Sequence, residues 1–361
     1  MRPARCARKG RLRGERASIL RGAMRPDATR AAGQISARPF QASDEAAVLE
    51  LLQAGFGSWP TDVQGATPAQ FFAWKHTAGP LGRSLLLVAE ADDQIVGFVA
   101  YMPWRFHADG GVIRAMRGAD LVVHAGCRRR GVSMALRAAA EFSSDVALVW
   151  SSPNDISRRS GLKSGQREIG GLGHFLRPSK ALRRTLAAAR SSASRRAEDR
   201  PVEAQSAADA LREEARVQPV LDSVRPPRDR LATVIDLDYL RWRYGKLQDY
   251  HAIVHAGGRG AMLIFRTRLH GRVLVAEVCE LLHAPHNHRA ARRLLAALGD
   301  VTRAQLISCS FASRREAALC GFVIPSRYRA VVMAYPLQEN LVPDPTRSWS
   351  WAPSLGDLEL F

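Results

Sequence analysis

The sequence predicts a mixed α/β fold arranged as two tandem lobes. Three observations support this. Strand-like and helix-like segments alternate from residue 35 onward, a weaker copy of the same series returns in the second half, and a stretch of different composition separates the two. The spacing agrees as well, because Asp120 to Gly165 spans 45 positions and Glu280 to Gly321 spans 41. A supersecondary unit repeated in this way indicates an internal duplication.

The first element is a predicted amphipathic helix over residues 43–56, with Ser43 or Asp44 as its N-cap. Its apolar face comprises Val48, Leu51, Leu52 and Phe56. After it, "SLLLVAEADDQIVGFVAYMPW" reads as two strands joined by a turn at Asp92 and Asp93.

The rest of the first half alternates in the same way. "GGVIRAMRGADLVVHAG" gives a pair of strand-like runs that end at Gly126, and a helix follows with Leu136, Ala139 and Ala140 on one face. Residues 146–150, "VALVW", are a short buried strand, and a turn-and-helix segment then leads to a last strand. We therefore place the first lobe at 35–177.

Residues 178–228 are rich in Ala, Arg, Ser and Glu, which predicts a partly helical linker. The second lobe is expected at 229–340, where strand, Gly-rich turn, strand, turn and strand precede a helix, a strand, a second helix and a final strand. We expect residues 341–361 to be a C-terminal tail.

The formal net charge of +19 is concentrated at one end of the chain, since residues 1–33 carry +8 and few large apolar residues. Such a segment cannot bury enough surface to offset its ordering entropy, so we expect a disordered basic tail. Its Arg-rich, acid-poor composition also resembles a transit peptide. Because the charge is placed there, we expect no nucleic-acid partner.

No apolar run approaches the roughly 20 residues needed to span a bilayer, so membrane insertion is not expected. The cysteines are odd in number and lack metal-ligand spacing, which favours a cytoplasmic location. The histidines of "HAPHNH", at positions 283, 286 and 288, have no acidic or cysteine neighbour in sequence, and we interpret them as a polar loop rather than a metal site. The cysteines are Cys6, Cys127, Cys279, Cys309 and Cys320.

The segment "CRRRGVSMALRAAAEF" carries the most informative chemistry. Three arginines stand where a helix begins, although the unpaired N–H groups of a helix N-terminus are already positive. A strand, a tight loop with Gly131 and a helix are the parts of a phosphate-binding cradle, and guanidinium groups pair well with phosphate. Neither GxGxxG nor GxxxxGK[ST] is present, which argues against a dinucleotide fingerprint and a Walker loop.

The order of elements and the stretch "DLVVHAGCRRRGVSMAL" resemble the GCN5-related N-acetyltransferase family, well over residues 35–175 and more weakly over 235–336. The family motif (Q/R)xxGx(G/A) corresponds to Arg128, Gly131 and Ser133. The resemblance implies an acyl-CoA N-acyltransferase fold in which each lobe holds a mixed, mostly antiparallel sheet flanked by helices. It also implies acetyl-CoA as acyl donor.

By this resemblance, the strand backbone holds the pantetheine, the loop cradles the pyrophosphate, and "PN" supplies a further contact. The implied cofactor-binding residues are Leu121, Val123, Arg128, Arg129, Arg130, Gly131, Val132, Ser133 and Asn154.

Four positions of the implied site depart from the family pattern. Ala125 replaces the usual proline, Arg129 a common glycine and Ser133 the final Gly/Ala. The tyrosine that many members use to protonate the leaving thiolate is Gly161 here, so Ser151, Ser152, Ser160 or water must act, or the thiolate leaves unassisted.

The candidate general bases are Asp120 and His124, with Glu90 on a neighbouring strand as a further candidate, and each also has an ordinary structural interpretation. In the second lobe no glycine opens the helix after "HAPHNH", so we expect that lobe to complete the acceptor cleft rather than bind coenzyme A in the same way.

We therefore expect an acetyl-CoA-dependent N-acetyltransferase acting by direct transfer on a small-molecule amine. "DLDYLRWRY" and the closing "WSWAPSLGDLELF" resemble segments of two-lobed bacterial acetyltransferases linked to exopolysaccharide synthesis, which suggests an amino sugar, although Trp242 and Tyr244 also fit a packed helix. Two alternatives remain open. One is a catalytically silent acyl-CoA-binding protein, and the other is a nucleic-acid-binding protein on the same scaffold.

Overall fold

The computed structural model describes residues 34–57, 59–60, 66–109, 111–171, 173–180, 182, 204–246, 249–255, 260–326 and 331–358. The basic tail expected at residues 1–33 lies outside these ranges. So do residues 181 and 183–203 of the expected linker. No helix among the described residues is long and apolar enough to cross a membrane.

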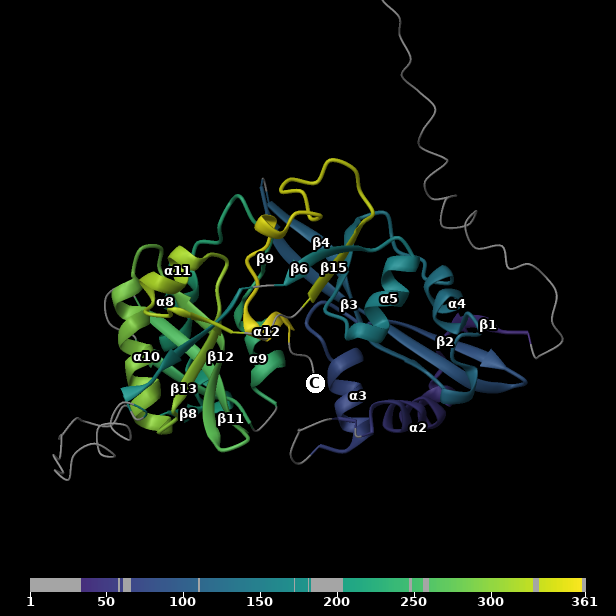
Figure 1. Ribbon diagram of the computed structural model, residues 1–361, viewed down its shortest axis with the longest axis horizontal. Helices are drawn as coiled ribbons and strands as arrows, with labels where there is room; N and C mark the ends of the chain where they lie inside the picture. The colour runs from purple at the N-terminus through teal and green to yellow at the C-terminus, as the bar shows by residue number, and fades with distance from the viewer. Residues whose placement is uncertain are drawn as a thin grey trace, which may run out of the picture. The chain divides into compact units, whose positions relative to one another are not determined.

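Two mixed sheets form the framework (Figure 1). Sheet A has the strand order β1-β2-β3-β4-β5-β15-β6, with β9 paired to β3. Its strands are β1 (Ser36–Pro39), β2 (Leu85–Ala91), β3 (Gln94–Ala108), β4 (Gly111–Val123), β5 (Val146–Ser151), β6 (Arg167–Gly171), β9 (Ala232–Thr233) and β15 (Val331–Pro336).

Sheet B has the strand order β14-β7-β13-β12-β11-β10-β8. Its strands are β7 (His174–Pro178), β8 (Gln205–Ser206), β10 (His251–His255), β11 (Ala261–His270), β12 (Val273–His283), β13 (Leu306–Ser310) and β14 (Ile324–Pro325).

The helices of the described residues flank these sheets. They are α2 (Glu45–Phe56), α3 (Pro68–His76), α4 (Val132–Ala138), α5 (Asp155–Lys163), α7 (Ala207–Arg212), α8 (Glu214–Ser223), α9 (Leu237–Tyr244), α10 (His288–Thr302), α11 (Arg314–Leu319) and α12 (Leu355–Leu358), with 3-10 turns η1 (Ala42–Asp44), η2 (Ala125–Cys127) and η3 (Ser348–Ser350).

Each sheet contains a parallel pair at the corresponding place, β4 with β5 and β12 with β13, while its other recorded pairs are antiparallel. Both parallel pairs are joined through a helix, α4 in one case and α10 in the other, and a second helix then ends at a left-handed glycine, Gly165 or Gly321. The predicted mixed α/β architecture with two sheets is therefore confirmed.

Two strands lie in a different sheet from the one that their place in the chain suggests. β7, from the first half, pairs with β13, while β15, from the second half, inserts between β5 and β6. Sheet membership thus crosses the expected boundaries at residues 177 and 229, because strand partners are chosen by long-range pairing that local sequence patterns do not record.

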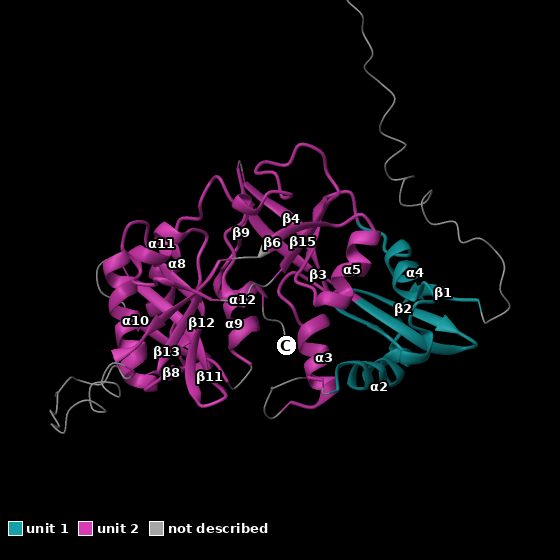
Figure 2. Cartoon of the chain, in the orientation of Figure 1, with its two compact units in different colours: residues 1–57, 85–99, 120–142 teal, residues 58–84, 100–119, 143–361 magenta. Residues whose placement is uncertain are grey.

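The chain divides into two compact units (Figure 2). Unit 1 comprises residues 1–57, 85–99 and 120–142, and unit 2 comprises 58–84, 100–119 and 143–361. In unit 1 the predicted helix α2 buries Val48, Leu51 and Leu52, whereas Phe56 is exposed.

In unit 1, α4 packs closely on β2 and β3. A methyl group added at Gly97 would meet the side chains of Val132, Leu136 and Ala89, so the helix is held against the strand at van der Waals distance. This close approach holds the first turn of α4 against β3. The loop of residues 128–130, which carries the three arginines and which we call the arginine loop, lies just before that turn. The predicted apolar face is reduced to Leu136 at full burial, because α4 ends at Ala138.

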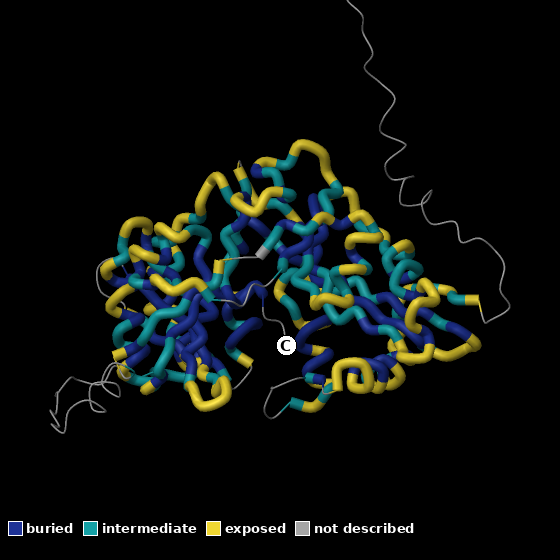
Figure 3. The backbone as a smooth tube through the Cα atoms, viewed as in Figure 1, coloured by how far each residue is buried: buried dark blue, intermediate teal, exposed yellow. Residues whose placement is uncertain are grey.

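In unit 2, α10 covers sheet B and buries Leu294, Leu295 and Leu298 against strands that carry Phe265 and Val278 (Figures 1 and 3). The described part of the expected linker also belongs to this core. α7 and α8 bury apolar side chains at helical spacing, so residues 204–223 pack as part of the sheet B layer rather than connect freely.

Two further expectations differ from the structure. The two strand-like runs of residues 110–126 are a single strand, β4, whose direction changes at Asp120 with φ +52°. The expected C-terminal tail is largely buried over residues 350–358, where Trp351 is 2 % exposed. Its apolar and small residues were too few to mark an element on their own.

Candidate functional site

The loop between β4 and α4 is fixed at its start by backbone and side-chain hydrogen bonds. The N–H of His124 donates to the carbonyl of Val96 on β3 at 2.8 Å. The N–H of Gly126 donates to Nδ1 of His124 at 3.3 Å, and Cys127 is buried beneath the turn. With Nδ1 acting as an acceptor, the neutral ring carries its proton on Nε2, which places His124 in the architecture of the loop.

Two left-handed residues shape the next part of the loop. Arg129 has φ +66° and Gly131 has φ +85° with ψ 0°, directly before the first residue of α4. A Cβ at Gly131 would meet nothing within 4 Å, so glycine is required by the backbone conformation and not by crowding. The N–H groups of Gly131 and Val132 have no acceptor in the hydrogen bonds of the described residues, as expected at a helix start.

The three arginines of the loop are exposed around this helix start. Arg130 contacts Cys127 through Nη1 and Sγ at 3.7 Å. Among the described residues, no carboxylate forms an ion pair with Arg128 or Arg129. Backbone donors, an open left-handed glycine and exposed guanidinium groups together suit a pyrophosphate.

The strand before the loop carries the other expected contacts in unit 1. Asp120 is half-buried, and its positive φ interrupts the regular alternation of β4. Such an irregularity re-aims the following peptide groups. Leu121 and Val123, on either side of buried Val122, are also half-buried. The expected strand residues therefore form one continuous run with the loop.

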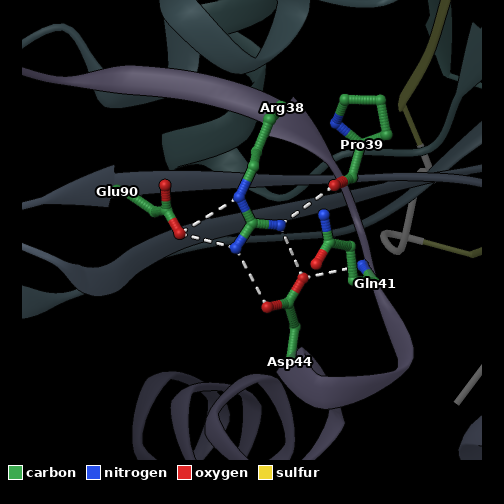
Figure 4. A network of polar contacts seen from close by, with 5 residues as sticks. All are labelled: Arg38, Pro39, Gln41, Asp44 and Glu90. Carbon is green, nitrogen blue, oxygen red and sulfur yellow. Dashed lines mark hydrogen bonds and ion pairs between the residues drawn. The ribbon is translucent and has the colours of Figure 1, made fainter.

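Glu90, a candidate base from the sequence, lies in an ion-pair cluster with Arg38 and Asp44 (Figure 4). Arg38 donates to Glu90 Oε1 from Nη2 at 2.5 Å and to Asp44 Oδ2 from Nη1 at 2.8 Å. The Arg38 guanidinium, which lies between them, holds the pKa of Asp44 below its usual value. Arg38 on β1 pairs with Glu90 on β2 and with Asp44 just before α2. Glu90 therefore has a structural role, because its carboxylate helps to hold these three elements together.

Asn154 directly precedes α5 and Gly161 lies on it, both in unit 2, and each has an identifiable structural role. The side chain of Asn154 accepts the N–H of Ser157 at 2.9 Å as the N-cap of α5. A Cβ at Gly161 would lie 2.6 Å from Gln166 Oε1 and 2.9 Å from Met333 Cε, so α5 packs directly on β15. The residue that stands where many acetyltransferases have tyrosine therefore has no room for an aromatic ring.

A buried polar cluster in unit 2, which the sequence did not predict, surrounds the single turn of α12. Arg117 on β4 donates to the carbonyls of Asp357 and Leu358, the latter at 3.1 Å. Arg243 on α9 donates to the carbonyl of Gly356 at 3.2 Å, and Ser152 donates to that of Leu358 at 3.2 Å. The terminal carbonyls of the turn are thus satisfied by buried cations and a hydroxyl, which leaves Ser152 engaged in structure.

The other side of this cluster contains two buried carboxyl groups. Tyr244 donates to Glu280 Oε1 at 2.6 Å, and Ser354 donates to the same atom at 3.1 Å. Burial raises the pKa of Glu280 to about 8 and raises that of Asp357 as well. The α12 turn is consequently held between β4 of sheet A and β12 of sheet B by a network within unit 2.

The helix predicted from "DLDYLRWRY" is α9, and its aromatic residues are packed. Trp242 stacks on Trp74 with ring centroids 5.5 Å apart, and each indole N–H donates to the carbonyl of the other residue at 2.9 and 2.7 Å. Beside this pair a small cavity of about 20 Å³, enough for about one water molecule, is lined by aromatic side chains and buried Lys75. Its aromatic lining residues are Trp104, Tyr239 and Trp242.

Comparison with known proteins agrees with this fold. Residues 36–153 match the family model described as the acetyltransferase (GNAT) domain. The chain is similar to a GCN5-related N-acetyltransferase from Kribbella flavida, with a TM-score of 0.57 and 18% identity over 86% of this chain and 73% of that one. No curated protein sequence matches the chain.

Two further solved structures are similar at lower identity. One is a conserved protein of unknown function, a probable N-acyltransferase, from Enterococcus faecalis V583, with a TM-score of 0.57 and 13% identity over 84% of this chain and 73% of that one. The other is a GCN5-related N-acetyltransferase from Anabaena variabilis, with a TM-score of 0.58 and 9% identity over 83% and 72%. The fold is the acyl-CoA N-acyltransferase fold with two mixed sheets.

Proposed function

We propose that this chain is an acyl-CoA-dependent N-acetyltransferase that transfers an acetyl group directly to a small amine. The acetyltransferase (GNAT) domain match over residues 36–153 supports the reaction class. The observation that carries the proposal is the loop from Arg128 to Ser133, where a left-handed glycine, a helix start and exposed arginines coincide.

The loop residues would hold the pyrophosphate of the donor, the first two arginines pairing with its oxygens and the N–H groups of Gly131 and Val132 donating to them. The backbone of Leu121 and Val123 would hold the pantetheine arm in the manner of a neighbouring strand. Acetyl-CoA supplies the activated thioester when bound. A cofactor contact by Asn154 stays a prediction, since its side-chain oxygen already caps α5.

Proton removal from the acceptor amine is assigned to Asp120 in this proposal. Its half-buried position and its place at the bend of β4 put a carboxylate next to the strand segment expected to carry the thioester. His124 is the weaker candidate because Nδ1 already accepts the N–H of Gly126. A backbone N–H of the same segment would stabilise the oxyanion that forms on the carbonyl.

The acceptor is proposed to be an amino sugar. The resemblance of "DLDYLRWRY" and "WSWAPSLGDLELF" to segments of two-lobed bacterial acetyltransferases linked to exopolysaccharide synthesis supports this choice.

The test is calorimetric titration of acetyl-CoA into the wild-type chain and Gly131→Ala, with Gly271→Ala as the matched control. Both glycines have positive φ and open surroundings, so each alanine carries a similar backbone strain of about 1–2 kcal/mol, but Gly271 lies in the β11–β12 turn. We expect Gly131→Ala to weaken binding by about tenfold or more, as the loss of one charge-assisted hydrogen bond would. Absence of binding by the wild type would refute the proposal.

One observation favours a second function, a catalytically silent acyl-CoA-binding protein. Gly161 has no hydroxyl to protonate the leaving thiolate, and its neighbours leave no room for the tyrosine that many family members have there. A thiol-release screen of amino sugars, polyamines and aminoglycosides separates the two. Release with an amine supports the acetyltransferase. Tight acetyl-CoA binding with no release from any amine would assign the silent role instead.

A further inference from the structure

We propose that His283, His288 and Cys320 form a binding site for a divalent transition metal ion, with Zn²⁺ as its natural occupant. One ligand atom from each residue lies within 4.8 Å of the other two. All three belong to unit 2. The site is independent of the proposed acetyl transfer, and it gives a role to the histidine-rich loop that the sequence alone left as a polar turn.

Three different elements supply the ligands. His283 is the last residue of β12, His288 is the first residue of α10, and Cys320 directly follows α11. Sequence spacing hides this arrangement, because the cysteine stands 32 positions beyond the second histidine and reaches it only through the fold. Two imidazoles and one thiolate are a ligand set that suits zinc.

The hydrogen bonds around the site leave ligand atoms available. His283 Nδ1 lies 2.8 Å from the carbonyl of Ala284. That carbonyl can only accept, so Nδ1 donates and the lone pair of His283 is on Nε2. A backbone carbonyl behind a ring nitrogen is the usual support of a metal-bound histidine.

His288 gives more direct evidence that it is a metal ligand. His288 Nδ1 is buried and has no hydrogen-bond partner in the part of the chain that the structure describes. A buried polar atom without a partner is costly, and coordination of a metal would satisfy it.

The third ligand, Cys320, is fully buried. A coordinated thiol loses its proton, so the metal would bind the thiolate and release a proton on binding. The carboxylate of Glu316, four residues earlier on the same face of α11, interacts electrostatically with both Cys320 and His288. It brings negative charge to the site.

The separation of the donors is close to what a metal requires. Bonds of about 2.0–2.3 Å in a tetrahedron place donor atoms roughly 3.3–3.8 Å apart, so small side-chain rotations from a limit of 4.8 Å complete the geometry. Three protein ligands leave one position for water. The half-buried His283 gives that position access to solvent.

The site corresponds in topology to the arginine loop of unit 1. Each lies where a strand of a parallel pair leads into its crossover helix, β4 into α4 and β12 into α10. In the second half Asn287 is the N-cap of α10, in the place that Gly131 has before α4, and His288 follows it. A metal bound there would join the ends of β12, α10 and α11, so the duplicated position would hold a cation instead of a phosphate.

The test uses the full chain without a histidine tag, reduced and freed of metal with a chelator, and titrated with Co²⁺. We expect one equivalent to give the intense visible bands of tetrahedral cobalt and a sulfur-to-cobalt charge-transfer band. Cys320→Ser should abolish the charge-transfer band. His288→Ala should weaken binding at least about 100-fold, a change of about 2.7 kcal/mol.

Two matched controls distinguish the site from general metal affinity. His286→Asn changes an exposed histidine of the same loop that is outside the cluster, and asparagine tolerates its left-handed φ of +61°. Cys309→Ala removes another buried thiol of unit 2. Both should bind Co²⁺ as the wild type does.

Stability gives a second readout if a ligand variant fails to fold. Zn²⁺ should raise the unfolding temperature of the wild-type chain, and the chelator should reverse the shift. The proposal is overturned if the wild type binds no Co²⁺, if its spectrum lacks the charge-transfer band, or if folded Cys320→Ser binds as tightly as the wild type.

Discussion

Glu280→Gln tests the buried cluster around α12 because glutamine has the size of a protonated glutamic acid and no titratable proton. Glu280 is 1 % exposed and accepts hydrogen bonds from Tyr244 and Ser354. Its pKa is about 8 in the folded chain against an ordinary 4.5, and burial is the largest cause. Asp357, another buried carboxyl, opposes ionisation of Glu280, while Arg243 favours it more weakly.

The direction of the pH effect follows from the raised pKa. The stabilisation linked to protonated Glu280 is complete below pH 4.5, falls as pH rises and is lost once pH passes about 8. The slope is about 1.4 kcal/mol per pH unit, which amounts to about 5 kcal/mol over the interval. Glutamine keeps an acceptor for Tyr244 and Ser354 and stays neutral throughout.

The assay is urea unfolding of wild type and Glu280→Gln at half-unit steps from pH 5 to 8.5, with exposed Glu141→Gln as control. The free-energy difference between wild type and Glu280→Gln should change steadily with pH in favour of the variant, whereas the control should follow the wild type. Parallel pH curves for wild type and Glu280→Gln would show that Glu280 does not titrate between the two states, and would refute the reasoning.

Three other predictions concern the loop and the two crowded glycines. Replacing Arg128 and Arg129 together by alanine should weaken acetyl-CoA binding and flatten its dependence on salt, measured by calorimetry at several salt concentrations; an unchanged salt slope would exclude phosphate pairing. Gly356→Ala should destabilise unit 2 by about 1–3 kcal/mol in urea unfolding, because its methyl would overlap Tyr244 Oη and Glu280 Oε1, and a neutral result would contradict the packing. Gly161→Tyr should lower the unfolding temperature more than Gly161→Ala does. The flexible ends of Gln166 and Met333 can move aside for a methyl group but not for an aromatic ring. Equal effects of the two substitutions would argue against the α5–β15 contact.

Local patterns predicted most of the elements. The period of apolar residues located α2, and the turn at Asp92 and Asp93 located the β2–β3 hairpin. These signals depend only on residues a few positions apart, which a sequence records directly. The arginine loop was recognisable for the same reason, because strand, loop and helix start lie within one short segment.

Long-range partners could not be predicted in this way. The insertion of β15 between β5 and β6 and the approach of Cys320 to His288 each depend on tertiary pairing of distant segments. The burial of residues 350–358 depends on Arg117 and Arg243, whose charges gave no sign in the sequence that they would bind carbonyl groups. A segment whose sequence looks like a terminal tail can therefore be buried when distant residues donate hydrogen bonds to its backbone carbonyls.

The place of β15 in sheet A has a consequence for the order of events during synthesis. Until residues 331–336 leave the ribosome, β5 and β6 present open edges toward each other, and open edges invite pairing with other chains. Sheet A can therefore close only after nearly the whole second half has been translated. The first half of the chain thus completes its sheet only with a strand from the second half.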